Sequence, residues 1–202
     1  TTSRSGLSMT RRRVVVTGLG IISPVGNTVD QAWEAVTAGR SGIGPISRFD
    51  TATFPTKIAG EVRNFDPASY LPAKEVRRFD TFIHYGLAAG IDALRDSGLD
   101  LDKVEREQVG VCIGSGIGGL PLIEETQIAF AAGGMRKISP FFVPGSIINM
   151  ISGQLSIMLG LQGPNLAVVT ACTTANHSIG EAGRLIEYGD ADVMVAGGAE
   201  ST

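Results

Sequence analysis

The chain has 202 residues, of which 43% are hydrophobic and 18% charged, and its formal net charge is −3. This balance excludes an intrinsically disordered protein and gives no general attraction for nucleic acid or an anionic membrane. No apolar run approaches the roughly 20 residues that a membrane-spanning helix needs, and the N-terminus lacks a signal-peptide pattern. We therefore expect a globular cytoplasmic protein with neither nucleic acid nor membrane as its partner.

The two ends of the chain differ from the rest of it. Residues 1–10 begin with a polar, unpatterned stretch, TTSRSGLS, ahead of a natural start at Met9, and are interpreted as a remnant of cloning. The other end, GGAEST, stops directly after an apolar run, without a closing helix or a polar tail. We expect residues 11–202 to be the first part of a longer protein.

Strand and helix patterns alternate along the first half of the chain. Residues 12–20 form a β-branched run closed by glycines and predict a strand, and residues 27–42 predict the helix that follows. Residues 45–72 show no sustained period, which predicts a long ordered surface loop. Between Phe79 and Gly98 the apolar residues recur at helical spacing, which predicts a buried amphipathic helix.

The second half repeats this alternation. Its predicted units are, in chain order, a strand in 108–119, a helix in 120–130, a helix in 146–159, a strand at 166–170, a helix from Cys172 to about Gly189 and a strand at 191–198. Alternation of this kind is typical of an α/β protein whose sheet is covered by helices on both faces.

Glycine makes up 27 of the 202 residues, and one cluster, GSGIGG at 114–119, satisfies the dinucleotide-binding pattern. That pattern also needs an acidic residue about 20 positions later, at the end of the next strand. Residues 134–142 contain neither a strand pattern nor an acid. We therefore interpret the glycines as tight packing corners, and we expect no nucleotide, no other cofactor and no metal.

Cys172 stands where the predicted strand 166–170 meets the predicted helix. A cysteine at a helix N-terminus faces unpaired N–H groups and the positive end of the helix dipole, which favour the reactive thiolate. The helix terminus supplies only roughly 1 kcal/mol, so further donors must assist. A backbone N–H of the same turn can also stabilise an oxyanion. We predict Cys172 to be a nucleophile at a strand-to-helix elbow, and Cys112, in mid-strand, to be a buried structural thiol.

The chain contains two histidines, and neither is predicted to act as a base for Cys172. His177 follows Cys172 by five residues, which on a helix turns it about 140° away from the same face. His84 lies within the predicted amphipathic helix. Both histidines are interpreted as structural.

Five segments together resemble the N-terminal half of an elongating 3-oxoacyl-acyl carrier protein synthase of the bacterial type II kind: VVVTGLGIISPVG, GSGIGG, RKISPFFVPGSIINM, TACTTANHSIG and YGDADVMVAGGAE. The resemblance runs from about Arg11 to the end of the chain. It implies the first, N-terminal half of a thiolase-like layered αβαβα fold. One departure is Ala175, where the family often has glycine, but alanine is still small enough for close helix packing.

The resemblance implies fatty acid elongation by a decarboxylating Claisen condensation. Cys172 would accept an acyl chain as a thioester, and the carbanion from malonyl-acyl carrier protein would attack it; covalent catalysis splits one difficult step into two. The family's two active-site histidines lie in its C-terminal half, so these 202 residues alone are not expected to complete the cycle. Rival interpretations are a degradative thiolase and a non-catalytic partner subunit that shapes the acyl pocket, although the retained Cys172 argues against the latter.

The resemblance also implies further site residues and partners. Ile117 and Phe142 match family residues that line the acyl pocket, Phe142 across a homodimer interface. Lys74, Arg77 and Arg78 match a stretch that the family uses against its acidic acyl carrier protein, and their spacing places them on one exposed helical turn. Without the resemblance, the two apolar residues would be interpreted as core and the three basic ones as a solvated surface.

Overall fold

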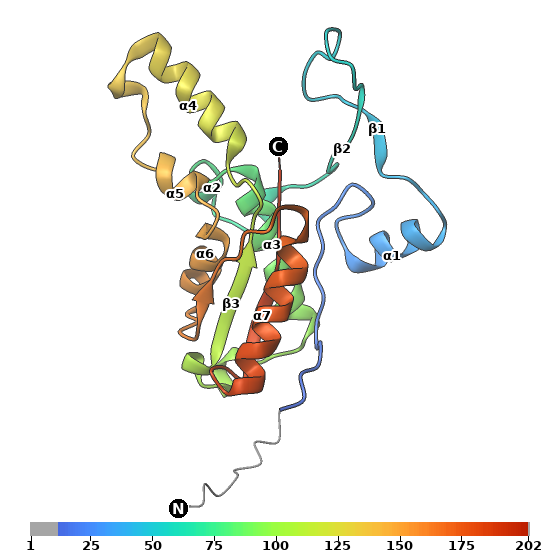
Figure 1. Ribbon diagram of the computed structural model, residues 1–202, viewed down its shortest axis with the longest axis vertical. Helices are drawn as coiled ribbons and strands as arrows, with labels where there is room; N and C mark the ends of the chain where they lie inside the picture. The colour runs from blue at the N-terminus through green and yellow to red at the C-terminus, as the bar shows by residue number, and fades with distance from the viewer. Residues whose placement is uncertain (1–11, 202) are drawn as a thin grey trace, which may run out of the picture.

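The computed structural model describes residues 12–201 and has a three-stranded parallel sheet at its centre (Figure 1). The strands lie in the order β4-β3-β5 and span Asn165–Leu166 (β4), Val109–Gly114 (β3) and Val193–Gly198 (β5). The strands predicted in 108–119 and 191–198 are thereby confirmed. The interpretation of residues 1–10 as a remnant falls outside the described range.

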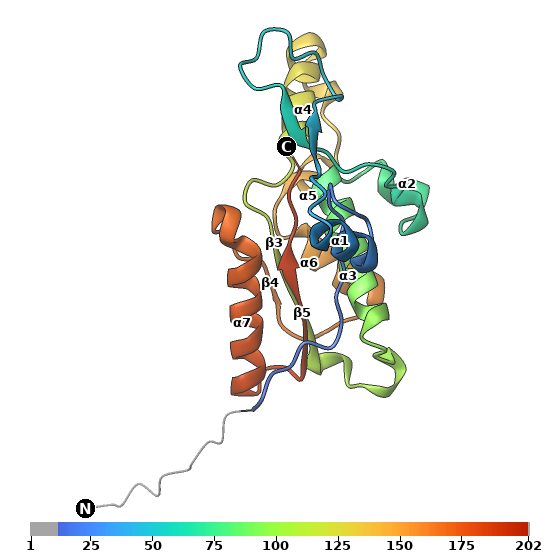
Figure 2. The same cartoon turned by 90° about the vertical axis from the view of Figure 1, so that its right-hand side faces the viewer.

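Helices cover both faces of this sheet (Figure 2). On one face lies α7 (Thr174–Tyr188), which packs against β3 and β5. On the other face lie α3 (Thr81–Asp96) and α6 (Met150–Leu159), which pack against the sheet and against each other. The prediction of an α/β sheet between two helical layers is confirmed.

The core lies between the sheet and the layer formed by α3 and α6. Its large, fully buried apolar side chains come from α3, α6 and β3: Phe82, Ile83, Leu87, Ile151, Leu155, Val109 and Val111. Each side chain of this size contributes about 1.5–3 kcal/mol by leaving water. Gly86 and Gly90 let α6 approach closely, because an added Cβ would lie 2.7 Å from Ile151 and 2.9 Å from Leu155. The amphipathic helix predicted here is confirmed.

Asp80 is a buried carboxylate at the N-terminus of α3 that also holds two further helices. It accepts hydrogen bonds from the Phe82 N–H at 3.4 Å and from the Leu122 N–H at 2.9 Å, within α4 (Leu120–Gly133). Its own N–H donates to the Gly145 carbonyl of α5 (Phe142–Ser146) at 3.1 Å. The start of α3 therefore fixes the positions of α4 and α5.

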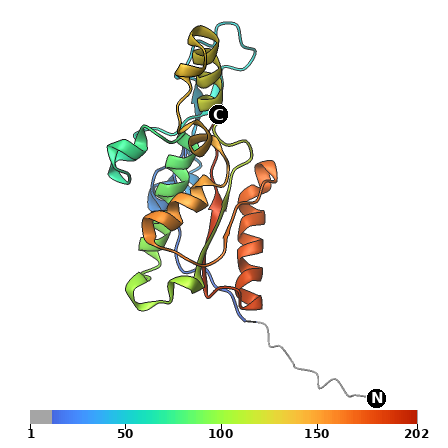
Figure 3. The ribbon, with the colours of Figure 1, turned by 90° about the vertical axis from the view of Figure 1, so that its left-hand side faces the viewer.

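Several elements project beyond the carboxyl ends of the strands. Helix α4 and the hairpin formed by β1 and β2 extend furthest (Figure 1), and the short α2 lies to one side of them (Figure 3). The hairpin strands are Ile43–Pro45 (β1) and Ile58–Gly60 (β2), and α2 spans Ala73–Val76. Single 3-10 turns occupy Pro67–Ser69, Leu101–Lys103, Arg106–Gln108, Met135–Lys137 and Ala171–Thr173.

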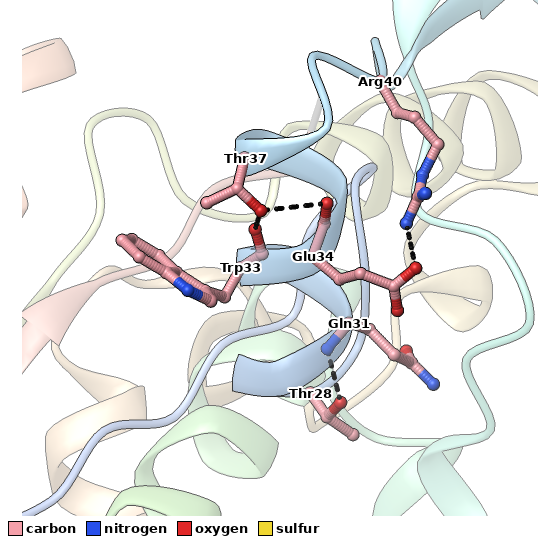
Figure 4. Close-up of polar contacts among 6 residues, drawn as sticks. All are labelled: Thr28, Gln31, Trp33, Glu34, Thr37 and Arg40. Atoms are coloured by element: carbon pink, nitrogen blue, oxygen red, sulfur yellow. Dashed lines mark hydrogen bonds and ion pairs between the residues drawn. The ribbon is translucent and has the colours of Figure 1, made fainter.

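Helix α1 (Val29–Thr37) confirms the helix predicted in 27–42, with closer bounds (Figure 4). It begins at Thr28, whose hydroxyl accepts a hydrogen bond from the Gln31 N–H at 3.3 Å and so satisfies one unpaired donor of the first turn. It ends just before Gly39, whose positive φ of 67° suits a residue without a Cβ.

The strand predicted at 12–20 is wrong. Residues 14–19 lie beside β5 and line a cavity of about 230 Å³ with it, but residues 12–20 form no strand. Val15 and Val16 are 67% and 76% exposed. β-branched residues fit a pleated, half-buried surface, but they do not by themselves provide a partner for the backbone.

The long ordered loop predicted at 45–72 is wrong in part, because the range contains β2 and the last residue of β1, Pro45. Gly44 pairs with Ala59 and Ile43 with Gly60 in an antiparallel register. Strands of three residues are too short to show an alternating pattern, so the sequence gives no local signal for them.

The strand predicted at 166–170 is also shorter than expected, since β4 ends at Leu166. The Ser152 hydroxyl of α6 accepts the Ile113 N–H at 2.9 Å and lies 2.7 Å from the Leu166 carbonyl, to which it can donate. The hydroxyl therefore lies between the Ile113 N–H and the Leu166 carbonyl, which would otherwise form a hydrogen bond of the parallel ladder directly. The helices predicted in 120–130 and 146–159 are confirmed as α4 and α6, although α6 begins only at Met150.

Candidate active site

Parallel pairing brings the ends of three strands to one edge of the sheet. Gly114 of β3 pairs with Gly198 of β5, and Cys112 pairs with Leu166 of β4. The loops that follow these strands therefore meet at their carboxyl ends, where open α/β sheets bind ligands. Cys172 lies in one of these loops.

The Cys172 side chain is exposed in the 3-10 turn Ala171–Thr173, directly before α7 begins at Thr174. The predicted position at a helix start is confirmed. Ala171 has a positive φ of 51°, which costs a non-glycine residue roughly 1–2 kcal/mol. Strain of this kind beside a candidate nucleophile is typical of functional sites, where the surrounding structure enforces an unusual backbone.

Hydrogen bonds around Thr170 hold this strained turn. The Thr170 carbonyl accepts from the N–H of Thr173 at 3.1 Å and from its hydroxyl at 2.7 Å. The Thr170 N–H donates to the hydroxyl of Thr174 at 3.0 Å. The side chains of Thr173 and Thr174 thus tie the backbone after Cys172 to Thr170 before it, and so restrain the turn that carries the cysteine.

Cys172 and Ile117 line one cavity of about 470 Å³, whose walls come from the ends of β3 and β5, the loops that follow them and the turn that leads into α7. The glycine loop after β3 reaches the cysteine turn because it lacks side chains. A Cβ on Gly114 would lie 2.0 Å from the Val168 carbonyl oxygen, and one on Gly116 would lie 3.3 Å from the Cα of Ala171. Of the residues assigned to the acyl pocket, the structure brings Ile117 to Cys172.

Ala175, the departure from the family pattern, packs against the end of β5. A Cβ added to Gly198 would lie 3.1 Å from the Ala175 N and 3.2 Å from its Cβ. The alanine methyl group therefore fills space that glycine leaves open on the facing strand. The expectation that alanine still allows close helix packing is confirmed.

Glu200 is a site residue that the sequence analysis missed. Its carboxylate accepts hydrogen bonds from the Ile117 N–H at 2.8 Å and the Ser115 hydroxyl at 3.0 Å. The loop N–H groups that a dinucleotide phosphate would need are thus directed to this side chain. The sequence does contain a signal for this residue: an acidic residue follows the apolar run 191–198, just as the glycine-rich loop follows the apolar run before it.

The two histidines have other partners. His84 is buried, and its Nε2 lies 3.1 Å from the Val76 carbonyl; burial lowers the pKa of its imidazole. The exposed His177 lies 3.9 Å from the Glu181 carboxylate on the next turn of α7. Within residues 12–201, no group of three or more His, Cys, Asp or Glu side chains could hold a metal ion.

Cys112 differs from Cys172 in its exposure to solvent. It lies in the middle of β3 with no exposed surface, which confirms the prediction of a buried thiol. Burial raises the pKa of the Cys112 thiol, and the neighbouring Ser178 hydroxyl offsets part of this shift.

Comparison with known proteins identifies the family. Residues 11–202 match the family model described as beta-ketoacyl synthase, N-terminal domain. The chain belongs to the beta-ketoacyl synthase family. The chain is 59% identical over 192 residues to 3-oxoacyl-acyl-carrier-protein synthase 2 of Vibrio cholerae and 54% identical to that of Coxiella burnetii. Each match covers 95% of this chain and 46% of the relative, so the chain spans about half the length of these relatives.

Solved ketosynthases share the fold. The ishigamide ketosynthase/chain length factor superposes with a TM-score of 0.82 and 31% identity, over 96% of this chain and 48% of that chain. A second solved structure is AntDE:AntF, a type II PKS acyl-carrier protein in complex with its ketosynthase bound to the hexaketide. It superposes with a TM-score of 0.77 and 28% sequence identity, over 95% of this chain and 51% of that chain. The fold is therefore the N-terminal part of the thiolase-like ketosynthase fold, as the resemblance implied.

For a beta-ketoacyl synthase, the position of Phe142 is informative. This partly buried residue begins α5, and it is not among the residues that line the Cys172 cavity of this chain. The structure thus separates Phe142 from Ile117 within one subunit. Its assignment to the acyl pocket across a dimer interface stays a prediction.

The three basic residues assigned to carrier binding are not equivalent. Lys74 and Arg77 are exposed, as expected. Arg78 is only 24% exposed, pairs with Glu75 at 2.8 Å and lies over the ring of Phe141. The prediction of one exposed helical turn is therefore wrong for Arg78, because α2 ends at Val76 and the chain then turns toward α5.

Among the described residues, no helix is both long and apolar enough to cross a bilayer.

Proposed function

We propose that Cys172 accepts an acyl chain as a thioester, and that the complete protein lengthens this chain by a decarboxylating Claisen condensation. The observation that carries the proposal is the exposed sulfur of Cys172 at the start of α7, in the same cavity as Ile117. Membership in the beta-ketoacyl synthase family supports the same chemistry. The chain residues 11–202 would form the N-terminal half of that enzyme.

The reaction has two covalent steps. In the first, the Cys172 thiolate attacks the carbonyl carbon of an acyl thioester, and the thiolate of the carrier leaves and takes up the proton that Cys172 lost. In the second, a malonyl thioester loses carbon dioxide, and the electron pair of the broken bond attacks the acyl-Cys172 carbonyl. A carbon–carbon bond forms, Cys172 leaves as a thiolate, and the product is a 3-oxoacyl thioester two carbons longer.

The residues around Cys172 are suited to the first step. Cys172 lies two residues before the first residue of α7, near the positive end of the helix dipole, which stabilises negative charge that develops in the reaction. The hydrogen bonds of Thr170 hold the backbone of the turn that places Cys172 at the cavity wall. Because His84 and His177 have other partners, we propose that the histidines of the second step belong to the remaining half of the complete enzyme.

Partners follow from the same proposal. The exposed cations Lys74 and Arg77 would attract an acidic acyl carrier protein, which delivers both the acyl and the malonyl group. A ketosynthase of the same fold, AntDE:AntF, is solved with its acyl-carrier protein, which supports this partner. We further propose a cytoplasmic homodimer, in which Phe142 of one subunit completes the acyl pocket of the other.

The test is acylation of the complete protein by an acyl-carrier protein, followed by peptide mapping with mass spectrometry. We expect the acyl mass on the peptide with Cys172 and none on the peptide with Cys112, the internal control. An acyl group on another side chain would contradict the proposal. Release of carbon dioxide from malonyl carrier separates this enzyme from a degradative thiolase, and elongation that survives iodoacetamide would instead indicate a non-catalytic pocket subunit.

A further inference from the structure

Glu200 joins the end of β5 to the glycine loop that follows β3. Its Oε1 accepts a hydrogen bond from the Ser115 hydroxyl at 3.0 Å, and its Oε2 accepts one from the Ile117 N–H at 2.8 Å. The Gly118 N–H lies 3.3 Å from Oε1 and 3.1 Å from the Ser115 hydroxyl, and is shared between them. One carboxylate therefore holds three donors of a single loop.

The register of the sheet places Glu200 opposite this loop. β3 and β5 pair in parallel up to Gly114 and Gly198, and the Ala199 N–H extends the ladder to the Gly114 carbonyl at 3.1 Å. Glu200 follows immediately. At position 116 an added Cβ would lie 2.9 Å from Oε2 of Glu200, so the absence of a side chain lets the carboxylate come close to the loop. The carboxylate and the loop are thus built to approach each other.

These hydrogen bonds restrain the backbone at Ile117 and Gly118. Hydrogen bonds to a carboxylate are charge-assisted and about twice as strong as neutral ones. The Ile117 side chain is 55% exposed, so packing contributes little to its position, whereas Ser115 beside it is 1% exposed and anchored. Removing the negative charge would leave the N–H groups of Ile117 and Gly118 without a strong acceptor, and the loop tip would gain freedom.

Ile117, Cys172 and Glu200 line the same cavity, so the loop tip stands where an acyl chain on the sulfur must lie. We propose that Glu200 is a positioning residue that holds Ile117 across this cavity and thereby limits the acceptance of long acyl chains. It acts through the loop backbone and does not touch the reacting atoms. This inference rests on the proposed function of Cys172 as the acyl acceptor.

The test compares the complete protein as wild type, as Glu200→Gln and as Glu125→Gln. Glutamine keeps the size of the carboxylate but loses its charge, and Glu125 is an exposed glutamate on α4 that serves as the matched control. Amide hydrogen exchange at Ile117 and Gly118 measures how well their N–H groups are protected by hydrogen bonds, and it does not depend on enzyme activity. Initial rates of Cys172 acylation by hexanoyl and tetradecanoyl carrier protein measure selectivity.

In Glu200→Gln we expect exchange at Ile117 and Gly118 to rise about tenfold. We expect the ratio of tetradecanoyl to hexanoyl acylation to rise by about fivefold, with no change in either quantity for Glu125→Gln. Unchanged exchange, or faster exchange with an unchanged or lower ratio, overturns the inference while the proposed function stands. If wild-type Cys172 takes neither acyl group, the proposed function fails and the inference fails with it.

Discussion

The guanidinium of Arg78 lies 4.0 Å from the centre of the Phe141 ring, in a cation–π contact. The same group forms an ion pair with Glu75 at 2.8 Å. Phe141 directly precedes Phe142, which the resemblance assigns to the acyl pocket. The stretch proposed to meet the carrier protein therefore contacts the segment proposed to shape the pocket.

This contact predicts different effects for two neighbouring arginines. We expect Arg77→Met to slow association with an acyl carrier protein by about threefold at low salt, because an exposed charge steers the encounter. Arg78→Met should slow it less and lower the free energy of unfolding by about 1 kcal/mol, through the lost ring contact. Stopped-flow binding and urea unfolding measure the two effects. Equal slowing by both variants would show that Arg78 acts as a docking charge after all.

The two cysteines should differ in their reaction with iodoacetamide. Cys172 is exposed, whereas Cys112 is buried in β3 with the pKa of its thiol raised by desolvation. We expect Cys172 to be alkylated at least about tenfold faster in the folded protein. Peptide mapping at successive times gives both rates, and a denatured sample is the control in which the rates converge. Comparable rates in the folded protein would contradict the burial of Cys112.

Ser152→Ala should destabilise the fold by about 1–3 kcal/mol. The variant leaves the buried Ile113 N–H without its acceptor and the Leu166 carbonyl without a donor. Ser156→Ala on the same helix is the control, because its hydroxyl bonds only the exposed side chain of Asn165 at 2.7 Å. Urea unfolding of both variants provides the comparison. An equal loss of unfolding free energy in the two variants would show that the Ser152 hydroxyl stabilises the fold no more than the Ser156 hydroxyl does.

His84 predicts a loss of stability on mild acidification. Burial lowers the pKa of its imidazole, offset in part by the Val76 carbonyl and by the charge of Asp80. The folded state therefore stays neutral at pH values where the unfolded chain, with an ordinary pKa of about 6.5, already binds a proton. The stability contributed by this group is complete above about pH 6.5 and is lost as the pH falls toward the folded-state pKa.

A His84→Gln variant isolates this contribution. Glutamine can still donate to the Val76 carbonyl but does not titrate. We expect the free energy of unfolding of the wild type to fall more than that of the variant between about pH 7 and about pH 5. Parallel pH profiles of the two proteins, measured by urea unfolding, would show that His84 does not titrate differently in the folded state.

The local parts of the fold could be predicted from the sequence, and the parts that depend on a distant neighbour could not. The apolar spacing of α3 is a property of the segment itself, so its buried face was predictable. The strand 12–20 failed because valines show only that a segment suits a sheet, and residues 14–19 lie beside the edge strand β5 without pairing with it. Likewise, nothing in residues 166–170 indicates that Ser152 takes over the hydrogen bond at Leu166.

The same distinction applies to the candidate site. The position of Cys172 follows from the residues on either side of it, and the structure confirms that position. The contact of Arg78 with Phe141 and that of Glu200 with Ile117 join segments far apart in the sequence, and both depend on how the sheet and helices assemble. Neither contact has a local signal.

The cavity beside Cys172 has walls on three separate loops, and the paired strands end at Gly114, Leu166 and Gly198, before the loops begin. A side chain such as that of Ile117 can therefore change without breaking any hydrogen bond of the ladder, whereas Gly114 has no room for a Cβ. Substrate preference and structural integrity thus become largely independent traits. Under the proposed function, a lineage with this scaffold can diversify its acyl substrates while it retains the framework that carries Cys172.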